Sequence, residues 1–208
     1  KKADKGDISA MLSYGLALEH GRFGVSVDKK EAARYFKIAA DKGNDRAMFN
    51  YSTILMHSKN DDEFRDMKED AVRYCKMSVD KGNVLAMHNY AMMLSHGSNG
   101  LKVDKAAAAR YYKMAADLGN VKSMNSYAAM LYNGHGVPQD KKEGIRYFQM
   151  GADKGNASAM YNLGCKILDN VANGSKEAAA RYIKIAAERG IVAAMEKYAK
   201  LLEDGIGV

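Results

Sequence analysis

The sequence has few cysteines, and their spacing excludes the usual roles of cysteine in a small protein. Cys75 and Cys165 are the only two among 208 residues, and neither belongs to a CxxC pair. Disulfide frameworks and zinc sites both need more cysteines at closer spacing. We therefore favour a reducing compartment and expect a cytoplasmic protein. The lumen of the endoplasmic reticulum stays open as an alternative, because Asn-x-Ser sequons occur at Asn50, Asn156 and Asn173.

The sequence also lacks a long apolar run. A membrane-spanning helix needs roughly 18 to 20 consecutive apolar residues, and the opening residues KKADKG have no apolar stretch of the signal-peptide kind. We therefore expect no segment that spans or targets a membrane. Apolar residues make up 47% of the chain, which is enough to bury a core. The formal charge of +7 would permit an acidic partner such as nucleic acid.

What the sequence contains instead is an internal repeat. A glycine ends a DKG-like tripeptide six times, with a period of 35 to 39 residues: Gly6, Gly43, Gly82, Gly119, Gly155 and Gly190. A methionine follows each glycine by five residues: Met11, Met48, Met87, Met124, Met160 and Met195. An arginine-tyrosine pair stands before the last five glycines, with the tyrosine eight residues ahead: Tyr35, Tyr74, Tyr111, Tyr147 and Tyr182. Anchors that recur in one register indicate a protein built from repeated units.

Each unit is predicted to hold two helices. In the first helix, apolar residues recur at spacings of three and four, as in Met48, Tyr51 and Leu55, and would share one buried face. In the second helix, alanines and aromatics form another apolar face, as in AARYFKIAA at 32–40. The expected first helices are 8–20, 45–57, 84–96, 121–133, 157–170 and 191–203. The expected second helices are 28–41, 66–80, 104–117, 140–153 and 175–188.

The residues between the helices agree with this division. Three acidic pairs fit a capping box, in which an aspartate accepts from an early N–H and a glutamate reaches back to the cap: Asp28 with Glu31, Asp66 with Glu69, and Asp140 with Glu143. A glycine that can end one helix precedes an asparagine suited to cap the next at Gly43, Gly82, Gly119 and Gly155. The single proline, Pro138, lies just outside a helix.

Helix pairs at this period predict an all-α fold, an α-solenoid of stacked antiparallel helix pairs with five full repeats and partial flanking repeats. We expect one solenoid domain over residues 1–208. The last residues, DGIGV, end where another second helix would begin. Because terminal repeats normally carry polar capping faces, we expect a fragment of a longer array.

The repeats closely resemble those of the Sel1-like repeat family, which is related to the tetratricopeptide repeats. Its pattern is matched nearly position for position by AMYNLGCKIL (159–168), NGHGVPQD (133–140) and AARYFKIAADKG (32–43). Two turns depart from it, HSKNDDEFRDMKE (57–69) and the shortened DNVANGS (169–175), and we expect their shapes to differ from the rest. The resemblance implies a right-handed superhelix that acts as an adaptor or scaffold in protein complexes, with no catalysis of its own.

Several local motifs suggest chemistry but are better explained by the repeat. The glycine loop at 133–140 looks like a phosphate site, yet similar loops recur at 20–28, 96–104 and 204–208, as expected of turns. His20, His57 and His96 occupy one register of successive repeats. Packed helix axes stand about 8–10 Å apart, too far for these side chains to share one zinc ion. We expect no metal or cofactor and no disulfide. For the acidic cluster Asp61, Asp62, Glu63, Asp66, Glu69 and Asp70 we expect a solvated loop, with a partner contact as the alternative; it lacks the spacing and glycine of a calcium-binding EF-hand.

Positions that vary between repeats on a shared face are free to encode specificity. By resemblance to tetratricopeptide repeats, the first helices line the concave surface, and we name their variable positions the first-helix face. Its candidate partner-binding residues are Phe49, Asn50, Met56, His88, Asn89, Met92, Asn125, Tyr132, Tyr161 and Asn162. Methionine and aromatic side chains suit an adaptable protein-binding surface. Burial between repeats, or a structural hydrogen bond for the asparagines, would explain the same residues.

The primary hypothesis is therefore a non-enzymatic scaffold that binds a protein or peptide on this surface. The first alternative is a nucleic-acid binder that uses a basic ridge on the second helices, formed by Arg34, Arg73, Arg110, Arg146 and Arg181. Acids four residues after the neighbouring lysines weaken it, as Asp41 does for Lys37. The second alternative is a hydrolase acting on β-lactams or peptidoglycan, to which some family members have been linked. No nucleophile–base pair is evident in the sequence.

Overall fold

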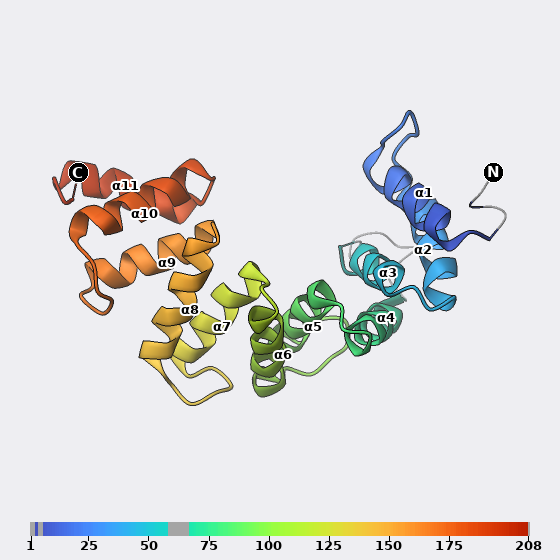
Figure 1. The fold of residues 1–208 in the computed structure, drawn as a ribbon, viewed down its shortest axis with the longest axis horizontal. Helices are drawn as coiled ribbons and strands as arrows, with labels where there is room; N and C mark the ends of the chain where they lie inside the picture. Colours follow the sequence, from blue (N-terminus) through green and yellow to red (C-terminus); the bar gives the residue numbers. More distant parts are fainter. Residues whose placement is uncertain (1–2, 4–5, 58–66, 208) are drawn as a thin grey trace. The chain divides into compact units, whose positions relative to one another are not determined.

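The computed structural model describes residues 3, 6–57 and 67–207, and it forms eleven α-helices, with no strand among these residues. Helices of the first and second type alternate along the chain, which confirms the predicted all-α repeat (Figure 1). The chain forms two compact units, Lys1–Asp104 and Lys105–Val208. Each unit is a run of antiparallel helices that pack against their neighbours in sequence.

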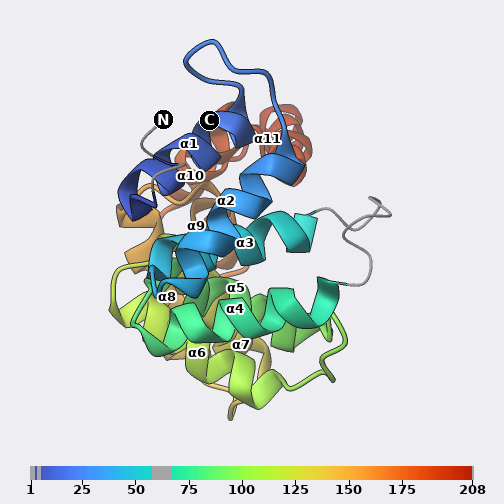
Figure 2. The ribbon, with the colours of Figure 1, turned by 90° about the vertical axis from the view of Figure 1, so that its right-hand side faces the viewer.

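The first unit contains five helices of 13 residues each. Its first helices are α1 (Ile8–His20), α3 (Asp45–His57) and α5 (Val84–His96), and its second helices are α2 (Lys29–Asp41) and α4 (Lys68–Asp80). Consecutive helices lie side by side from α1 to α5 (Figure 2). The bounds of its first helices agree with the prediction to the residue. Of the predicted acidic loop, Asp61, Asp62, Glu63 and Asp66 lie outside the described residues, whereas Glu69 and Asp70 lie in the first turn of α4.

The second unit contains six helices. Its second helices are α6 (Lys105–Asp117), α8 (Lys141–Asp153) and α10 (Lys176–Glu188), and its first helices are α7 (Val121–Asn133), α9 (Ala157–Leu168) and α11 (Val192–Glu203). Within this unit, the largest difference from prediction is the end of α9, at Leu168 rather than residue 170. Asn170 there adopts a left-handed backbone with φ 56°, so the helix cannot continue through it.

The helix boundaries follow from glycine and asparagine, as predicted. Each glycine before an asparagine has a positive φ, as Gly43 does at 88°, which ends the second helix. The asparagine then caps the next helix: Asn44 Oδ1 accepts from Ala47 N at 2.8 Å, and Asn156 Oδ1 from Ala159 N at 2.8 Å. The repeated Gly-Asn pair therefore sets every return turn in which it occurs.

Only half of the predicted capping box forms. Asp28 Oδ1 accepts from Glu31 N at 2.9 Å, but the Glu31 carboxylate binds Arg34 at 2.7 Å instead of reaching back. Glu143 likewise pairs with Arg146, and the Asp140 N–H donates to a carbonyl of α7. The predicted reach-back was wrong because the arginine of the Arg-Tyr pair stands three residues on, where a charge-assisted bond is stronger. The third predicted cap, Asp66, lies outside the described residues, and α4 begins after Met67 without a side-chain cap.

A tyrosine and an aspartate join successive second helices. Tyr147 on α8 donates its hydroxyl proton to Asp117 Oδ1 at the end of α6, at 2.8 Å, and Lys113 Nζ pairs with the same aspartate at 2.6 Å. In the first unit Tyr74 bonds Asp41 in the same way, and Lys37 pairs with Asp41 at 2.9 Å. The anchor tyrosine and the aspartate of DKG therefore form a hydrogen bond between neighbouring repeats, and we call this contact the joint.

This joint makes stability sensitive to alkaline pH. Burial, followed by the bond to Asp117, raises the pKa of Tyr147 to about 12, so the folded state keeps its proton above pH 10 while the unfolded chain loses it. The contribution of Tyr147 to stability is therefore complete below pH 10 and is lost as the pH rises towards 12. Tyr147→Phe should cost about 1 kcal/mol at pH 7 and flatten the alkaline fall by up to about 1.4 kcal/mol per pH unit. Urea unfolding of the wild type and the variant at pH 7 to 12 tests this.

Candidate functional site

In the first unit, the first-helix face is half-buried. Phe49, Asn50, His88, Asn89 and Met92 are each partly exposed, whereas Met56 is buried. Asn89 Nδ2 donates to Thr53 Oγ1 at 3.3 Å, which links α5 to α3. Asn89 therefore has a structural role between repeats, and the residues around it are accessible enough to contact a partner.

Met56 and Met92 come together in a pocket at the C-terminal ends of α3 and α5. The pocket has a volume of about 510 Å³ and is lined by Met56, His57, Met92, Met93, His96, Ser98 and Asn99. Ligand pockets commonly measure about 300–1,000 Å³ and combine apolar walls with a few polar groups. Three thioether side chains supply adaptable walls here, and two imidazoles and an amide supply the polar groups.

Asn99 is the polar group in this pocket that sequence reasoning missed. Its Nδ2 atom is buried and has no hydrogen-bond partner among the residues that the structure describes. An unpaired buried donor costs about 1–3 kcal/mol, so an acceptor from a bound molecule would relieve it. The backbone of Asn99 is left-handed, with φ 57°, like that of Phe23 in the corresponding loop of the first repeat. The sequence did contain a signal for it, because Asn99 is a polar residue in the loop at 96–104, which we explained by its glycines alone.

In the second unit, the predicted residues engage one another or neighbouring lysines. Asn162 Nδ2 donates to Asn125 Oδ1 at 2.8 Å, which links α9 to α7. The Tyr132 ring faces two ammonium groups, with Lys166 Nζ 4.4 Å and Lys141 Nζ 5.7 Å from its centroid. These contacts hold the side chains in place, and the four residues, Tyr161 included, remain half-buried.

Three of the five arginines of the predicted basic ridge are paired with acids of their own helices. Arg34, Arg73 and Arg146 bind the carboxylates three residues before them, at 2.7, 2.7 and 2.5 Å. Each guanidinium also lies over the ring of the tyrosine that follows it, at 4.7 to 5.7 Å. The recurring Arg-Tyr pair thus has a structural explanation within its own helix.

The cysteines and histidines show no reactive arrangement in the described part of the chain. Cys75 and Cys165 are free thiols, and burial raises the pKa of Cys75 to about 12 and raises that of Cys165. A thiol with a raised pKa is a poor nucleophile at neutral pH. His20, His57 and His96 are exposed at the ends of their helices, and the described residues hold no cluster of three His, Cys, Asp or Glu side chains suited to a metal ion.

Alternating helices that carry a variable face, with the tyrosine–aspartate contact recurring between second helices in both units, define an α-solenoid repeat protein. The chain belongs to the Sel1 repeat family: the model of the Sel1 repeat matches it five times, at residues 8–44, 45–83, 84–120, 121–156 and 157–191. These matches coincide with the successive helix pairs of the structure, since each match begins at a first helix.

Solved structures with the same fold support this assignment. A Sel1 repeat protein from Oxalobacter formigenes is 27% identical, with a TM-score of 0.85 over 97% of this chain and 80% of its own. A protective antigen of uropathogenic Escherichia coli that displays the SLR fold is 24% identical, with a TM-score of 0.83 over all of this chain and 44% of its own. An immunity protein from Pseudomonas aeruginosa is 18% identical, with a TM-score of 0.57 over 90% of this chain and 66% of its own. The last two show the fold alone, and no curated protein matches the sequence significantly.

The Sel1-repeat fold is commonly a scaffold for protein interactions and is typically non-catalytic. It therefore suggests protein partners for this chain. None of the helices in the described ranges is both long and apolar enough to pass through a lipid bilayer.

Proposed function

We propose that the chain is a non-enzymatic scaffold that binds a polypeptide segment on the first-helix face, with the methionine pocket of the first unit as its centre. The observation that carries the proposal is the buried Asn99 Nδ2 beside three methionines, which has no hydrogen-bond partner among the described residues. A peptide can supply two groups that complement this pocket: an apolar side chain for its methionines and a backbone carbonyl for the Asn99 donor. The carbonyl would accept from Asn99 Nδ2 while the side chain displaces water from Met56 and Met92.

The neighbouring first-helix residues extend the surface beyond the pocket. Phe49 and His88 lie at the corresponding position of successive first helices, α3 and α5, and are half-buried. Side chains of this kind lose little entropy on binding, because much of their freedom is already restricted. A bound segment would therefore run across α3 and α5 with its anchor residue in the pocket.

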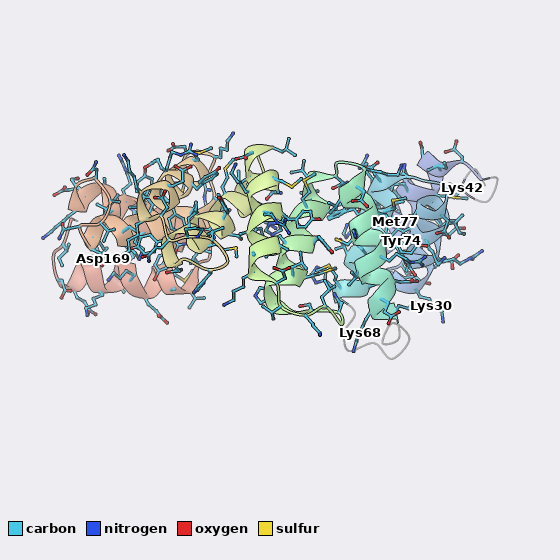
Figure 3. All side chains as sticks on the ribbon, turned by 90° about the horizontal axis from the view of Figure 1, so that it is seen from below. Lys30, Lys42, Lys68, Tyr74, Met77 and Asp169 are labelled. Carbon is cyan, nitrogen blue, oxygen red and sulfur yellow. The ribbon has the colours of Figure 1, made fainter. Side chains whose placement is uncertain are left out.

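Site-specific photocrosslinking tests the location. We expect a photoreactive residue at His88 to capture a protein partner from an extract of the source organism, and one at Met77 on α4 to capture none (Figure 3). With the partner purified, Met92→Glu should weaken binding at least roughly tenfold, because it places a charge against an apolar surface. Met77→Glu is the matched control, since Met77 is a methionine exposed to 37% on a second helix. Asn99→Gly keeps the left-handed backbone, removes the donor and should weaken binding roughly threefold.

Equal crosslinking from both positions, or wild-type affinity in Met92→Glu, would refute the assignment of this surface. Neither alternative function gains a specific observation from the structure. Arg34, Arg73 and Arg146 of the ridge are held by carboxylates, which reduces the charge available to phosphates. A hydrolase would need an activated nucleophile, and the buried Cys75 thiol stays protonated at neutral pH.

A further inference from the structure

Two glycine loops of the second unit pack on the preceding second helix: the loop after α7 packs on α6, and the loop after α11 packs on α10. A Cβ atom on Gly136, in the loop after α7, would collide with the Lys105 carbonyl and lie 2.7 Å from Ala106 N, in the first turn of α6. Gly207, after α11, meets the first turn of α10 in the same way, at Lys176 and Glu177. In both places the loop backbone packs directly on the start of a second helix.

The loop after α9 should cover α8 by the same rule, but it folds back on its own helix. The Ala172 N–H donates to the Lys166 carbonyl at 3.0 Å, in addition to a Val171 bond at 2.9 Å that matches the bond from His135 N to Met130 O after α7. Gly174 packs against the side chain of Ile167, with its Cβ position 2.9 Å from Cδ1. The shortened loop explains this: five positions separate the left-handed Asn170 from the cap Ser175, against six from Gly134 to Asp140, and Ala172 stands where Gly136 does.

An opening of about 340 Å³ is left over the first turn of α8. It is lined by Lys141, Lys142, Ile145, Val171, Ala172 and Asn173. Ile145, Val171 and Ala172 make its apolar part, and Val171 is exposed to 40%. Its size lies at the lower end of the range of ligand pockets, which suits one side chain with part of its backbone better than a cofactor.

The opening carries uncompensated positive charge. Among the residues that the structure describes, neither Lys141 nor Lys142 has a carboxylate within 4.0 Å of its ammonium group. The nearby acids make other contacts: Asp140 caps α8, Glu143 binds Arg146, and Asp169 at the end of α9 faces Lys166 at 3.9 Å. The positive end of the α8 dipole adds to the same field.

We propose that this opening is a second docking site, which takes an acidic peptide segment with one apolar residue between its carboxylates. The apolar side chain would rest on Ile145 and Val171, and the flanking carboxylates would pair with Lys141 and Lys142. The site lies wholly within the second unit and goes beyond the pocket of the proposed function. It would add a second, charge-selective contact to the scaffold.

The test uses a fluorescein-labelled peptide mixture in which Leu, Ile, Met or Phe stands between Asp or Glu residues. A matched mixture has Asn or Gln in place of the acids. We expect the acidic mixture to bind roughly tenfold more tightly by fluorescence anisotropy in low salt, and to weaken as salt is added. Lys141→Gln with Lys142→Gln should weaken its binding roughly fivefold. Val171→Asp should abolish it, because the new charge repels the ligand within the apolar part.

The control changes the two lysines at the equivalent positions of α2, which begins KKE as α8 does. Lys29→Gln with Lys30→Gln removes equal charge from the protein and should leave the affinity unchanged. If both double variants weakened peptide binding equally, the effect would come from the net charge of the protein, and the proposed site would be overturned. Failure of the acidic mixture to bind, or binding that survives Val171→Asp, would also overturn it. Met92→Glu should leave this binding intact, which separates the test from that of the methionine pocket.

Discussion

Gly136→Ala is expected to destabilise the second unit by about 2–5 kcal/mol, although it adds only one methyl group. Gly136 has φ 76°, where a residue with a Cβ atom costs about 1–2 kcal/mol. The new atom would also collide with the Lys105 carbonyl and the Ala106 nitrogen, which belong to the backbone of α6 and cannot rotate away. Overpacking of this kind typically adds about 1–3 kcal/mol.

Gly24→Ala separates the two contributions. Gly24 has nearly the same backbone, with φ 78°, and its Cβ position has no atom within 4 Å. Gly24→Ala should therefore lower the free energy of unfolding only through backbone strain, by about 1–2 kcal/mol. Repeat proteins can lose stability locally, so urea unfolding should be combined with hydrogen exchange at the first turn of α6. Faster exchange there in Gly136→Ala is expected, whereas equal costs for the two variants would show that the loop does not bear on α6.

The helices are predictable from the sequence because several signals repeat in one register. Met48 illustrates this: its spacing from the Gly43-Asn44 turn places it on the buried face, and it is buried in the structure. The same anchor fails at Met195, which is 46% exposed on α11. A repeat pattern defines which face is apolar, but burial also depends on a neighbouring helix being present.

Contacts between side chains of different repeats were less predictable. The sequence indicated that Asp140 caps α8, yet it did not show that Glu143 would prefer Arg146 to the cap N–H. It placed Met56 and Met92 on one face but did not reveal the pocket that they share, because Asn99 reaches it from a loop. Spacing along a helix predicts neighbours within that helix, whereas a pocket depends on loop conformation.

Close packing between the two helices of a repeat underlies the second large effect. Gly15 on α1 faces Phe36 on α2: a Cβ atom on Gly15 would lie 2.5 Å from Phe36 Cε1 and 2.8 Å from Cδ1. Phe36 is fully buried, so its ring has little room to move. Gly15→Ala should therefore cost about 1–3 kcal/mol, despite the better helix propensity of alanine. Phe36→Leu alone should cost about 1–2 kcal/mol, below the 3–5 kcal/mol of Phe→Ala.

The double variant should recover part of this loss, because a leucine leaves space for the added methyl group. We expect a coupling energy of about 1–2 kcal/mol between Gly15→Ala and Phe36→Leu, measured by urea unfolding of the four proteins in the cycle. Gly164 on α9 supplies the contrast. Its Cβ position lies 2.8 Å from Ile183 Cγ1 but also 3.0 Å from the Ala179 carbonyl oxygen, which belongs to the backbone of α10. Ile183→Val should therefore rescue Gly164→Ala only slightly, since valine removes Cδ1, at 3.3 Å, but keeps a carbon at Cγ1, and the backbone contact also stays in place. Additive costs at Gly15 and Phe36 would mean that the ring moves freely and that its close approach to α1 does not constrain the packing of the repeat.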